Sequence, residues 1–397
     1  MSGELDLSGT EVGVLADATL PRSAAEDWRY GPIDTLDFEA LSRVNPTPAV
    51  DQADGGEPWV ELLGGGFDAV LRIANGRIVG FETGESGTVR RVDIAHPSSL
   101  DEGEPFAYLA AALSPERITV ELGDRDSPSR LLCIRQVSAG SDLHASEVTF
   151  QVPAGMEASV VEVRTGGSLG AFSAIRTNVR VADDAHLSYV SVQDLARDTW
   201  ELAHLDGAVA RSGRLRALHL ALGGDYARLR TECRLNGAGA EAEILAGYLG
   251  TGNQTHEFRT FQIHEAAKTQ SNLLYKGALG GSSHSIYSGL IKVEKGATGS
   301  NAFQTNRNIV LGDHAHADSV PNLDIQENEV KCSHASAVGP VDAEQTYYLE
   351  SKGIPTQAAQ QMIVRGFFRE LLDNLPLGSL DSLVDRSLDG LWDEESR

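Results

Sequence analysis

The chain has 397 residues, of which 41 are glycine and only 6% are aromatic, and its formal net charge at pH 7 is −24. So acidic a surface repels phosphate backbones, which argues against nucleic-acid binding. The length suits a large core in about two to three domains, and a glycine-rich, aromatic-poor composition favours short strands over long helices.

The three cysteines, Cys133, Cys233 and Cys332, are too few for a disulfide framework, so we expect a reducing compartment. The first residues carry neither a basic region nor an apolar run, and we expect no signal peptide there. The longest apolar run, Phe106–Leu113, is far shorter than the ~20 residues of a membrane-spanning helix. The sequence therefore predicts a cytoplasmic protein without a membrane partner.

Residues 1–115 predict a mixed region with connectors rich in proline, aspartate and glycine. Trp28 is expected to anchor a short helix on the core. Residues 105–113 suit a second helix because apolar side chains recur there at helical spacing, at Phe106, Leu109, Ala110 and Leu113.

From about residue 117 the pattern changes to short alternating runs that are separated by Gly, Asp or Asn. The turn pairs Ala154–Gly155, Asp183–Asp184 and Ser212–Gly213 recur at roughly 25–30 residues, a period typical of stacked repeats. Helices long enough for βαβ crossovers are missing, which leaves a β-sandwich or a parallel β-helix. The repeat favours the β-helix. The expected strands include Ile118–Leu122, Val160–Val163, Val179–Val181, Leu187–Val192, Leu215–Leu220, Leu229–Cys233 and Ile244–Tyr248.

Cys332 and His334 lie two positions apart in a stretch whose apolar residues Leu323, Ile325 and Val330 predict strands. Side chains at i and i+2 of a strand point to the same face. A thiol beside an imidazole makes half of a soft-metal site, of the kind that binds zinc, copper or an iron–sulfur cluster. A cluster takes about four ligands, so the others must come from elsewhere in the fold or from a second chain.

After Gly339 the pattern becomes helical. Asp342 is a suitable N-cap for a helix that Gly353 ends, and Pro355–Thr356 opens a second helix. This second helix carries two apolar stripes, the first of Ala359, Met362, Ile363, Gly366, Phe367 and Leu371 and the second of Val364, Phe368 and Leu372. A helix that is apolar on two sides needs two covers, which predicts a partner here. The alternative is a buried helix in a small helical cap.

Two further pairs of chemically active side chains are expected to be structural. Cys133 and Cys233 lie in apolar, strand-like runs and are predicted to be core residues. His256 and His264 flank another expected strand, and we predict hydrogen bonding inside the solenoid for both.

The remaining polar candidates are expected at the surface. His314–His316 offers two imidazoles that could bind a metal, but the adjacent Asp313 and Asp318 favour a solvated turn. Lys276 and Lys292 are predicted to face solvent rather than to act in catalysis.

The stretch Val330–His334 is followed by Gly339, Asp342 and Glu344, then by Tyr347–Leu349 and Ser351–Ile354. Together these residues resemble the C-terminal signature of the SufB/SufD family of iron–sulfur cluster assembly scaffolds. The motif Lys-Cys-Ser-His resembles the SufD branch of that family. The departures, at Ala335, Glu329 and Lys352, remove no candidate ligand.

The resemblance implies a mainly β fold. A right-handed parallel β-helix core over residues 116–340 would stand between an N-terminal mixed α/β region, 1–115, and a C-terminal helical domain, 341–397. It also implies a complex of one SufB-like subunit, one SufD-like subunit and two SufC ATPases, with SufC docked on the C-terminal helices. Cys332 and His334 would then be metal ligands at the SufB–SufD interface, holding a transient iron–sulfur cluster shared with SufB. His334 is the first choice and Cys332 the second. A homodimer in the absence of SufB is left open.

No Gly-Lys-Ser or Gly-Lys-Thr phosphate loop occurs, so we expect a non-catalytic scaffold whose SufC partner hydrolyses ATP. Two alternatives stay open. The first is a purely structural adapter in which Cys332 and His334 merely pack. The second is a β-helix carbohydrate-active enzyme, which would need a cluster of carboxylates along one solenoid face, and no such row recurs.

Overall fold

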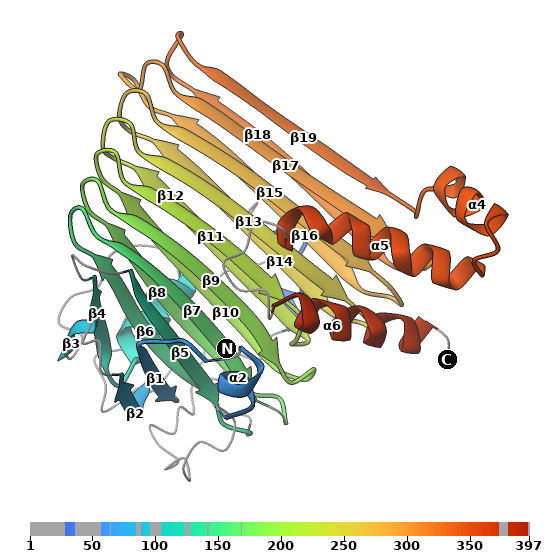
Figure 1. The fold of residues 1–397 in the computed structure, drawn as a ribbon, viewed down its shortest axis with the longest axis horizontal. Helices are drawn as coiled ribbons and strands as arrows, with labels where there is room; N and C mark the ends of the chain where they lie inside the picture. Colours follow the sequence, from blue (N-terminus) through green and yellow to red (C-terminus); the bar gives the residue numbers. More distant parts are fainter. Residues whose placement is uncertain are drawn as a thin grey trace, which may run out of the picture.

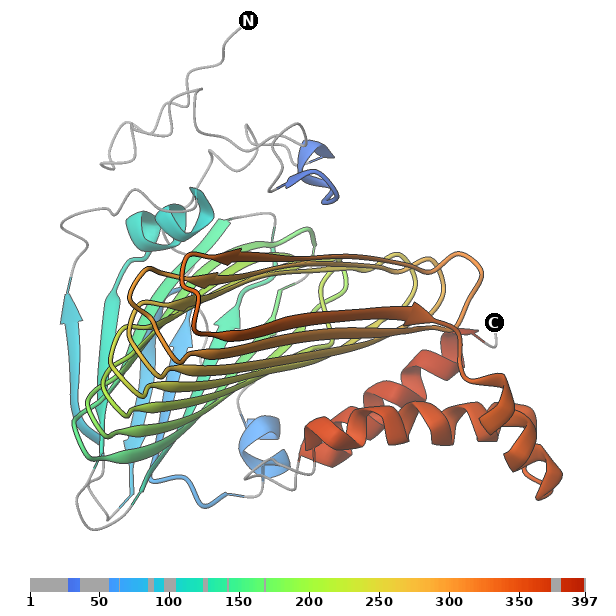
Figure 2. The same cartoon turned by 90° about the horizontal axis from the view of Figure 1, so that it is seen from above.

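A computed structural model describes residues 28–35, 57–63, 65–84, 89–95, 105–123, 128–140, 143–167, 169–372 and 380–395. Two sheets of mostly parallel strands face each other and run the length of the molecule (Figure 1). The chain alternates between them, so that each pair of strands makes one coil of a flattened β-helix (Figure 2). The predicted mainly β fold with a parallel β-helix core is confirmed.

One sheet contains ten strands within the described residues, and we call it the odd sheet because all of its strands except β2 have odd numbers. In spatial order from the C-terminal end they are β19 (Lys331–Gly339), β17 (Asn301–Val310), β15 (Gln270–Leu279), β13 (Glu241–Gly250), β11 (Arg214–Ala221), β9 (His186–Leu195), β7 (Glu157–Gly166), β5 (Ser129–Val137), β1 (Ala69–Ala74) and β2 (Arg77–Thr83).

The other sheet contains nine strands within the same part of the chain, and we call it the even sheet because all of its strands except β3 have even numbers. In the same direction they are β18 (His316–Ile325), β16 (His284–Val293), β14 (Thr255–His264), β12 (Tyr226–Leu235), β10 (Trp200–Val209), β8 (Phe172–Val181), β6 (Leu143–Val152), β4 (Arg117–Leu122) and β3 (Val89–Ala95). Among the described strands, β2 and β3 alone pair antiparallel with their neighbours.

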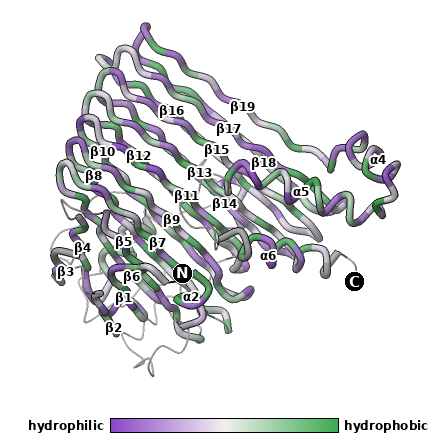
Figure 3. Tube along the Cα trace, in the orientation of Figure 1, coloured by the Kyte–Doolittle hydropathy of each residue, from purple (hydrophilic) through white to green (hydrophobic). Residues whose placement is uncertain are grey.

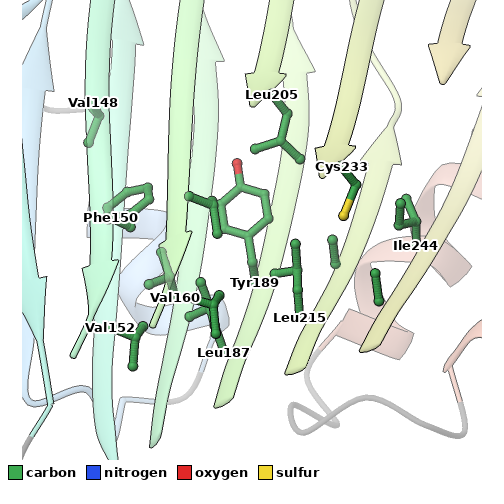
Figure 4. Close-up of a cluster of buried hydrophobic side chains, with 14 of the residues drawn as sticks. Val148, Phe150, Val152, Val160, Leu187, Tyr189, Leu205, Leu215, Cys233 and Ile244 are labelled. Atoms are coloured by element: carbon green, nitrogen blue, oxygen red, sulfur yellow. The ribbon is translucent and has the colours of Figure 1, made fainter. Parts of the chain in front are cut away.

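Each strand alternates between inward and outward side chains, visible as a repeating change of hydropathy along the strands in Figure 3. The inward set fills the space between the sheets with one continuous apolar cluster, which includes Phe150, Val160, Tyr189, Leu205 and Ile244 (Figure 4). Stacked coils in register therefore bury the core without long helices.

The turns between strands behave as the sequence predicts. Gly155 and Gly239 have φ values of 69° and 72°, a backbone region that L side chains rarely adopt. Asp184 and Ser212 occupy equivalent turns with φ values of 57° and 53°. In the regular coils this turn recurs, so neighbouring strands of one sheet, such as β11 and β13, begin at paired residues.

Helices cover the outer faces of the two sheets differently. The C-terminal helices α5 (Thr356–Leu372) and α6 (Leu380–Glu395), with α2 (Glu57–Leu62), lie on the outer face of the odd sheet (Figures 1 and 2). The helix α3 (Pro105–Leu113) and the 3-10 helix η2 (Ile33–Thr35) contribute to an apolar cluster on the outer face of the even sheet. Trp28 joins this cluster, and the Arg228 guanidinium lies over its ring, 3.4 Å from the ring centroid. Trp28 is therefore buried as predicted, whereas the residues before it, where the short helix is expected, lie outside the described residues.

The C-terminal helical prediction holds in outline. The helix α4 (Ala343–Ser351) is capped by the Asp342 carboxylate, and α5 begins at Thr356. The predicted stripes on α5 are wrong in detail. The row that packs on the odd sheet is Val364, Phe368 and Leu371, while Met362 of the predicted first stripe is 51% exposed. A spacing of four and three residues places one row on the sheet, and Met362 lies off that row.

The domain limits 1–115, 116–340 and 341–397 stay predictions. Strands β1 and β3 of the N-terminal region extend the two sheets, so that region shares the stacked architecture. Among the described residues, no helix has the length and apolar character needed to cross a lipid bilayer.

Candidate functional site

The candidate site lies on the last coil, at the C-terminal end of the stack. Strand β19 pairs with β17 on one side only, with Cys332 beside Ala302 and His334 beside Gln304. Ala302 and Gln304 are buried inward residues, so Cys332 and His334 project from the same inner face of the odd sheet. The structure therefore brings the two predicted ligands side by side at the C-terminal end of the β-helix. We call this open end, which β18 and β19 form, the mouth.

The mouth is open. His334 is exposed and Cys332 is half-buried, whereas Gln304 and Ala302 one coil below are fully buried. Three apolar side chains that occupy inward positions of the last coil, Leu323, Ile325 and Val338, are also exposed. Both β18 and β19 leave one backbone edge unpaired within the described chain. Such long edges with apolar neighbours favour pairing with another chain.

One hydrogen bond orients the His334 ring and selects its tautomer. Its Nδ1 lies 3.1 Å from the carbonyl oxygen of Pro321 on β18, across the mouth. A carbonyl oxygen can only accept, so Nδ1 carries a proton, and in the neutral form of the ring the lone pair is on Nε2. Orientation of an imidazole by a backbone carbonyl is the usual support for a metal-ligating histidine.

Cys332 is less prepared to bind a metal. It packs against a small cluster that includes Ile291, Val293 and Ala302. This burial raises the pKa of the Cys332 thiol, and the hydrogen bond from the backbone of Ala302 offsets only part of the rise. The isolated chain therefore presents a thiol rather than a thiolate at neutral pH, which favours His334 as the first ligand.

A buried polar network supports the mouth from below. The Tyr287 hydroxyl donates to Gln304 Oε1 at 3.1 Å, and Gln304 Nε2 donates to the Asn322 carbonyl at 3.2 Å. Next to Gln304 on the same face, Asn306 Nδ2 donates to the Tyr248 hydroxyl at 2.9 Å. Gln304 is the direct partner of His334 in the β17–β19 register. The network therefore holds in place the side chain next to the imidazole.

Comparison with known proteins gives the family. A family model described as "SUF system FeS cluster assembly, SufBD core domain" matches residues 135–367, more than half of the chain. This chain belongs to the SufBD family. The predicted resemblance to the SufB/SufD family, most like SufD, is confirmed.

Named relatives agree with this assignment. An iron–sulfur cluster assembly SufBD family protein of Mycobacterium tuberculosis is 39% identical over 221 residues, 54% of this chain and 55% of that protein. The iron–sulfur cluster assembly protein SufD of Escherichia coli is 29% identical over 369 residues, 90% of this chain and 85% of that protein. The SufD of Bacillus subtilis is 33% identical over 222 residues, 54% of this chain and 50% of that protein. The matched part thus spans about half the length of the mycobacterial and Bacillus relatives.

The other two cysteines and two of the other histidines of this SufBD family chain take the structural roles that the sequence predicts. Cys133 and Cys233 are buried, and burial raises the pKa of both thiols, to about 12 for Cys233. His256 and His264 lie fully inside the β-helix. His264 lies within hydrogen-bond distance of the Thr269 and Ser271 hydroxyls, at 2.7 and 2.8 Å.

Lys276 corrects a prediction. The sequence indicates a solvent-facing side chain, but Lys276 is only 3% exposed because α5 lies over it. Its ammonium donates to the Phe367 carbonyl at 2.8 Å and pairs with the Glu370 carboxylate. Lys276 therefore ties α5 to β15. Lys292, by contrast, is partly exposed and pairs with Glu294, as a surface residue does.

The C-terminal helices present a second exposed surface. Tyr347 and Tyr348 on α4 are 73% and 61% exposed, and Met362 on α5 is exposed as well. Adjacent exposed tyrosines are typical of interface residues, because each ring adds apolar contact area and one hydrogen-bonding group. We define Tyr347, Tyr348 and Met362 as the helical surface.

Proposed function

We propose that this protein is a SufD-like scaffold subunit of iron–sulfur cluster assembly. Its open mouth pairs with a SufB-like β-helix, and a nascent cluster forms between the two chains. The observation that carries the proposal is the placement of Cys332 and His334 on one inner face of an uncovered last coil. The family supplies the class of cargo, since its model describes iron–sulfur cluster assembly.

Pairing at the mouth fits the shape of the coil. Both edge strands run parallel to the stack below, and β18 has ten residues and β19 nine. A second β-helix with the same two-sheet cross-section continues both sheets by main-chain hydrogen bonds. Leu323, Ile325 and Val338 would then become inward residues of a continuous core.

The ligand set follows from the chemistry of the two side chains. His334 offers Nε2 on a ring that is already oriented, and Cys332 becomes a ligand once a metal displaces its proton. Two ligands leave about two positions of a cluster for the SufB-like subunit. The cluster is thus a transient, shared cargo. This chain acts as a non-catalytic scaffold, and the three free cysteines suit the reducing cytoplasm.

Energy input belongs to a second partner in this proposal. The helical surface docks a SufC-like ATPase, and Tyr347 and Tyr348 supply the apolar contacts. Because Lys276 fixes α5 to the odd sheet, movement of the docked ATPase is transmitted to β15 and the coils next to the mouth.

The test separates the cluster from the ATPase. The complex with SufB-like and SufC-like partners is purified with His334→Ala, with Cys332→Ala or with His314→Ala as the matched control, because His314 is an exposed histidine outside the mouth. Iron and sulfide content after anaerobic reconstitution is measured beside ATP hydrolysis. We expect cluster yield to fall most with His334→Ala and to stay unchanged with His314→Ala, with ATP hydrolysis retained throughout. Undiminished cluster yield with both mouth variants would leave a structural adapter instead.

A further inference from the structure

A second group of potential metal ligands lies on the other sheet. His284 of β16 and His316 of β18 are direct partners in the parallel register, and Asp318 stands two residues after His316. These positions alternate with buried inward residues such as Ser285 and Tyr287, so all three side chains project from the outer face of the even sheet. The Cys332–His334 mouth uses the inner face of the odd sheet, which makes the two groups separate.

The three side chains already converge. His284 Nε2 lies 2.8 Å from one carboxylate oxygen of Asp318, and His316 Nε2 lies 3.4 Å from the other. The two imidazole centroids are 5.3 Å apart, and one ligand atom from each residue lies within 4.8 Å of the others. Ligands at about 2.0–2.2 Å from a tetrahedral metal are about 3.4 Å from each other, so only small side-chain rotations separate this geometry from coordination.

The backbone imposes this arrangement. Direct neighbours across a parallel pair are about 4.8 Å apart, and i and i+2 share a face, so one register fixes all three Cβ positions. Two imidazoles and one carboxylate on one side are the donor set that holds iron(II) or zinc with further positions open. The side chains remain accessible, since His316 is exposed and His284 and Asp318 are half-buried.

We propose that His284, His316 and Asp318 form a site for a divalent first-row transition-metal ion such as zinc or iron(II). The ion takes two imidazole nitrogens and one carboxylate oxygen from this chain and keeps water in its open positions. Because the ligands come from β16 and β18, the bound ion cross-links the last strand of the even sheet to its neighbour. It thereby orders one of the two edges that border the mouth.

The test uses zinc binding to the full chain. His334→Ala serves as the background, so that the mouth does not contribute its imidazole, and bound metal is first removed with a chelator. Calorimetric titration with Zn²⁺ and the visible absorption of added Co²⁺ are compared for Asp318→Asn, His316→Ala and the matched control His314→Ala. Asp318→Asn keeps the side-chain shape on a partly exposed residue, and circular dichroism checks the fold.

The proposal predicts one equivalent of Zn²⁺ in the background chain and in the His314→Ala control. Asp318→Asn and His316→Ala should each weaken binding by at least about tenfold. Zinc should also slow amide exchange in His316–Ile325, because the ion joins β18 to β16. A background chain that binds no zinc, or an Asp318→Asn chain that binds as tightly as its parent, would show a surface hydrogen-bonded triad only.

Discussion

Acidification should destabilise this protein through its buried histidines, and His264 gives the clearest case. Its imidazole is fully buried inside the β-helix, and burial lowers its pKa from the ordinary 6.5 to about 4. Burial likewise lowers the pKa of His256 to about 4 and that of His219 to about 3. The folded state therefore holds these rings neutral at pH 5, whereas the unfolded chain protonates them.

The sign and size follow from proton linkage. Between pH 7 and pH 5 the unfolded state binds more protons than the folded state, so the free energy of unfolding falls as the pH falls. A pH of 5 lies 1.5 units below the ordinary histidine pKa of 6.5, so the ring is protonated in the unfolded chain, while in the folded chain it is still neutral. Each such histidine therefore lowers the free energy of unfolding by about 2 kcal/mol. A domain stability of about 5–15 kcal/mol makes one such loss easily measurable.

The assay is urea denaturation followed by circular dichroism at pH 7 and pH 5, for the parent chain and for His264→Gln. His264→Gln weakens the contacts with Thr269 and Ser271 at both pH values, so that constant loss cancels in the pH difference. Buried acids such as Glu201, whose pKa burial raises, shift the total in the opposite direction but act equally in both chains. We expect the variant to lose about 2 kcal/mol less than the parent between pH 7 and pH 5. An identical pH dependence in both chains would refute the reasoning.

Three further variants probe the surfaces described above. Lys276→Met removes the ammonium that ties α5 to β15 and should speed amide exchange in α5, at a cost of about 1–3 kcal/mol; unchanged protection would contradict that role. Tyr347→Ser combined with Tyr348→Ser should weaken binding of a SufC-like ATPase at least about tenfold by calorimetry. The melting temperature should stay unchanged, because both rings are exposed, and full-affinity binding would exclude this docking surface. Leu323→Lys places a charge on the inner edge of the mouth and should abolish co-purification with a SufB-like partner, while retained co-purification would place the contact elsewhere.

The β-helix could be predicted because its signals are local and repeated. A run such as Ile244–Tyr248 falls inside β13, and the turn at Ser212–Gly213 separates β10 from β11, as the alternating pattern indicates. Each coil repeats the same pattern of alternating strand and turn residues, so a wrong prediction for one strand does not change the predicted architecture. Cys332 and His334 could be paired from sequence for the same reason, since i and i+2 on a strand share a face.

Contacts between distant segments could not be predicted this way. Lys276 looks like a surface residue on its own strand, and only the placement of α5 over β15 buries it. The sequence pattern pairs His316 with the nearby His314, but His314 lies in the turn before β18 and His316 faces His284 instead. That partner is one coil away, so finding it requires the length of the coil as well as the strand period.

In the proposed complex, Cys332 would couple partner binding at the mouth to metal binding. In the isolated chain, partial burial already raises the pKa of this thiol. A partner coil over the mouth removes the remaining solvent, and without a cation that would raise the pKa further and hold sulfur in its protonated, non-ligating form. A metal ion reverses the balance because it stabilises the thiolate directly, and does so more strongly where water is excluded. The proposed ligand His334 needs no such deprotonation of a thiol, because its Nδ1–H already donates to the Pro321 carbonyl and directs Nε2 to the metal. In this proposal, a partner that closes the mouth would therefore favour the metal-loaded state, with His334 as the first ligand and Cys332 as the ligand that forms on closure.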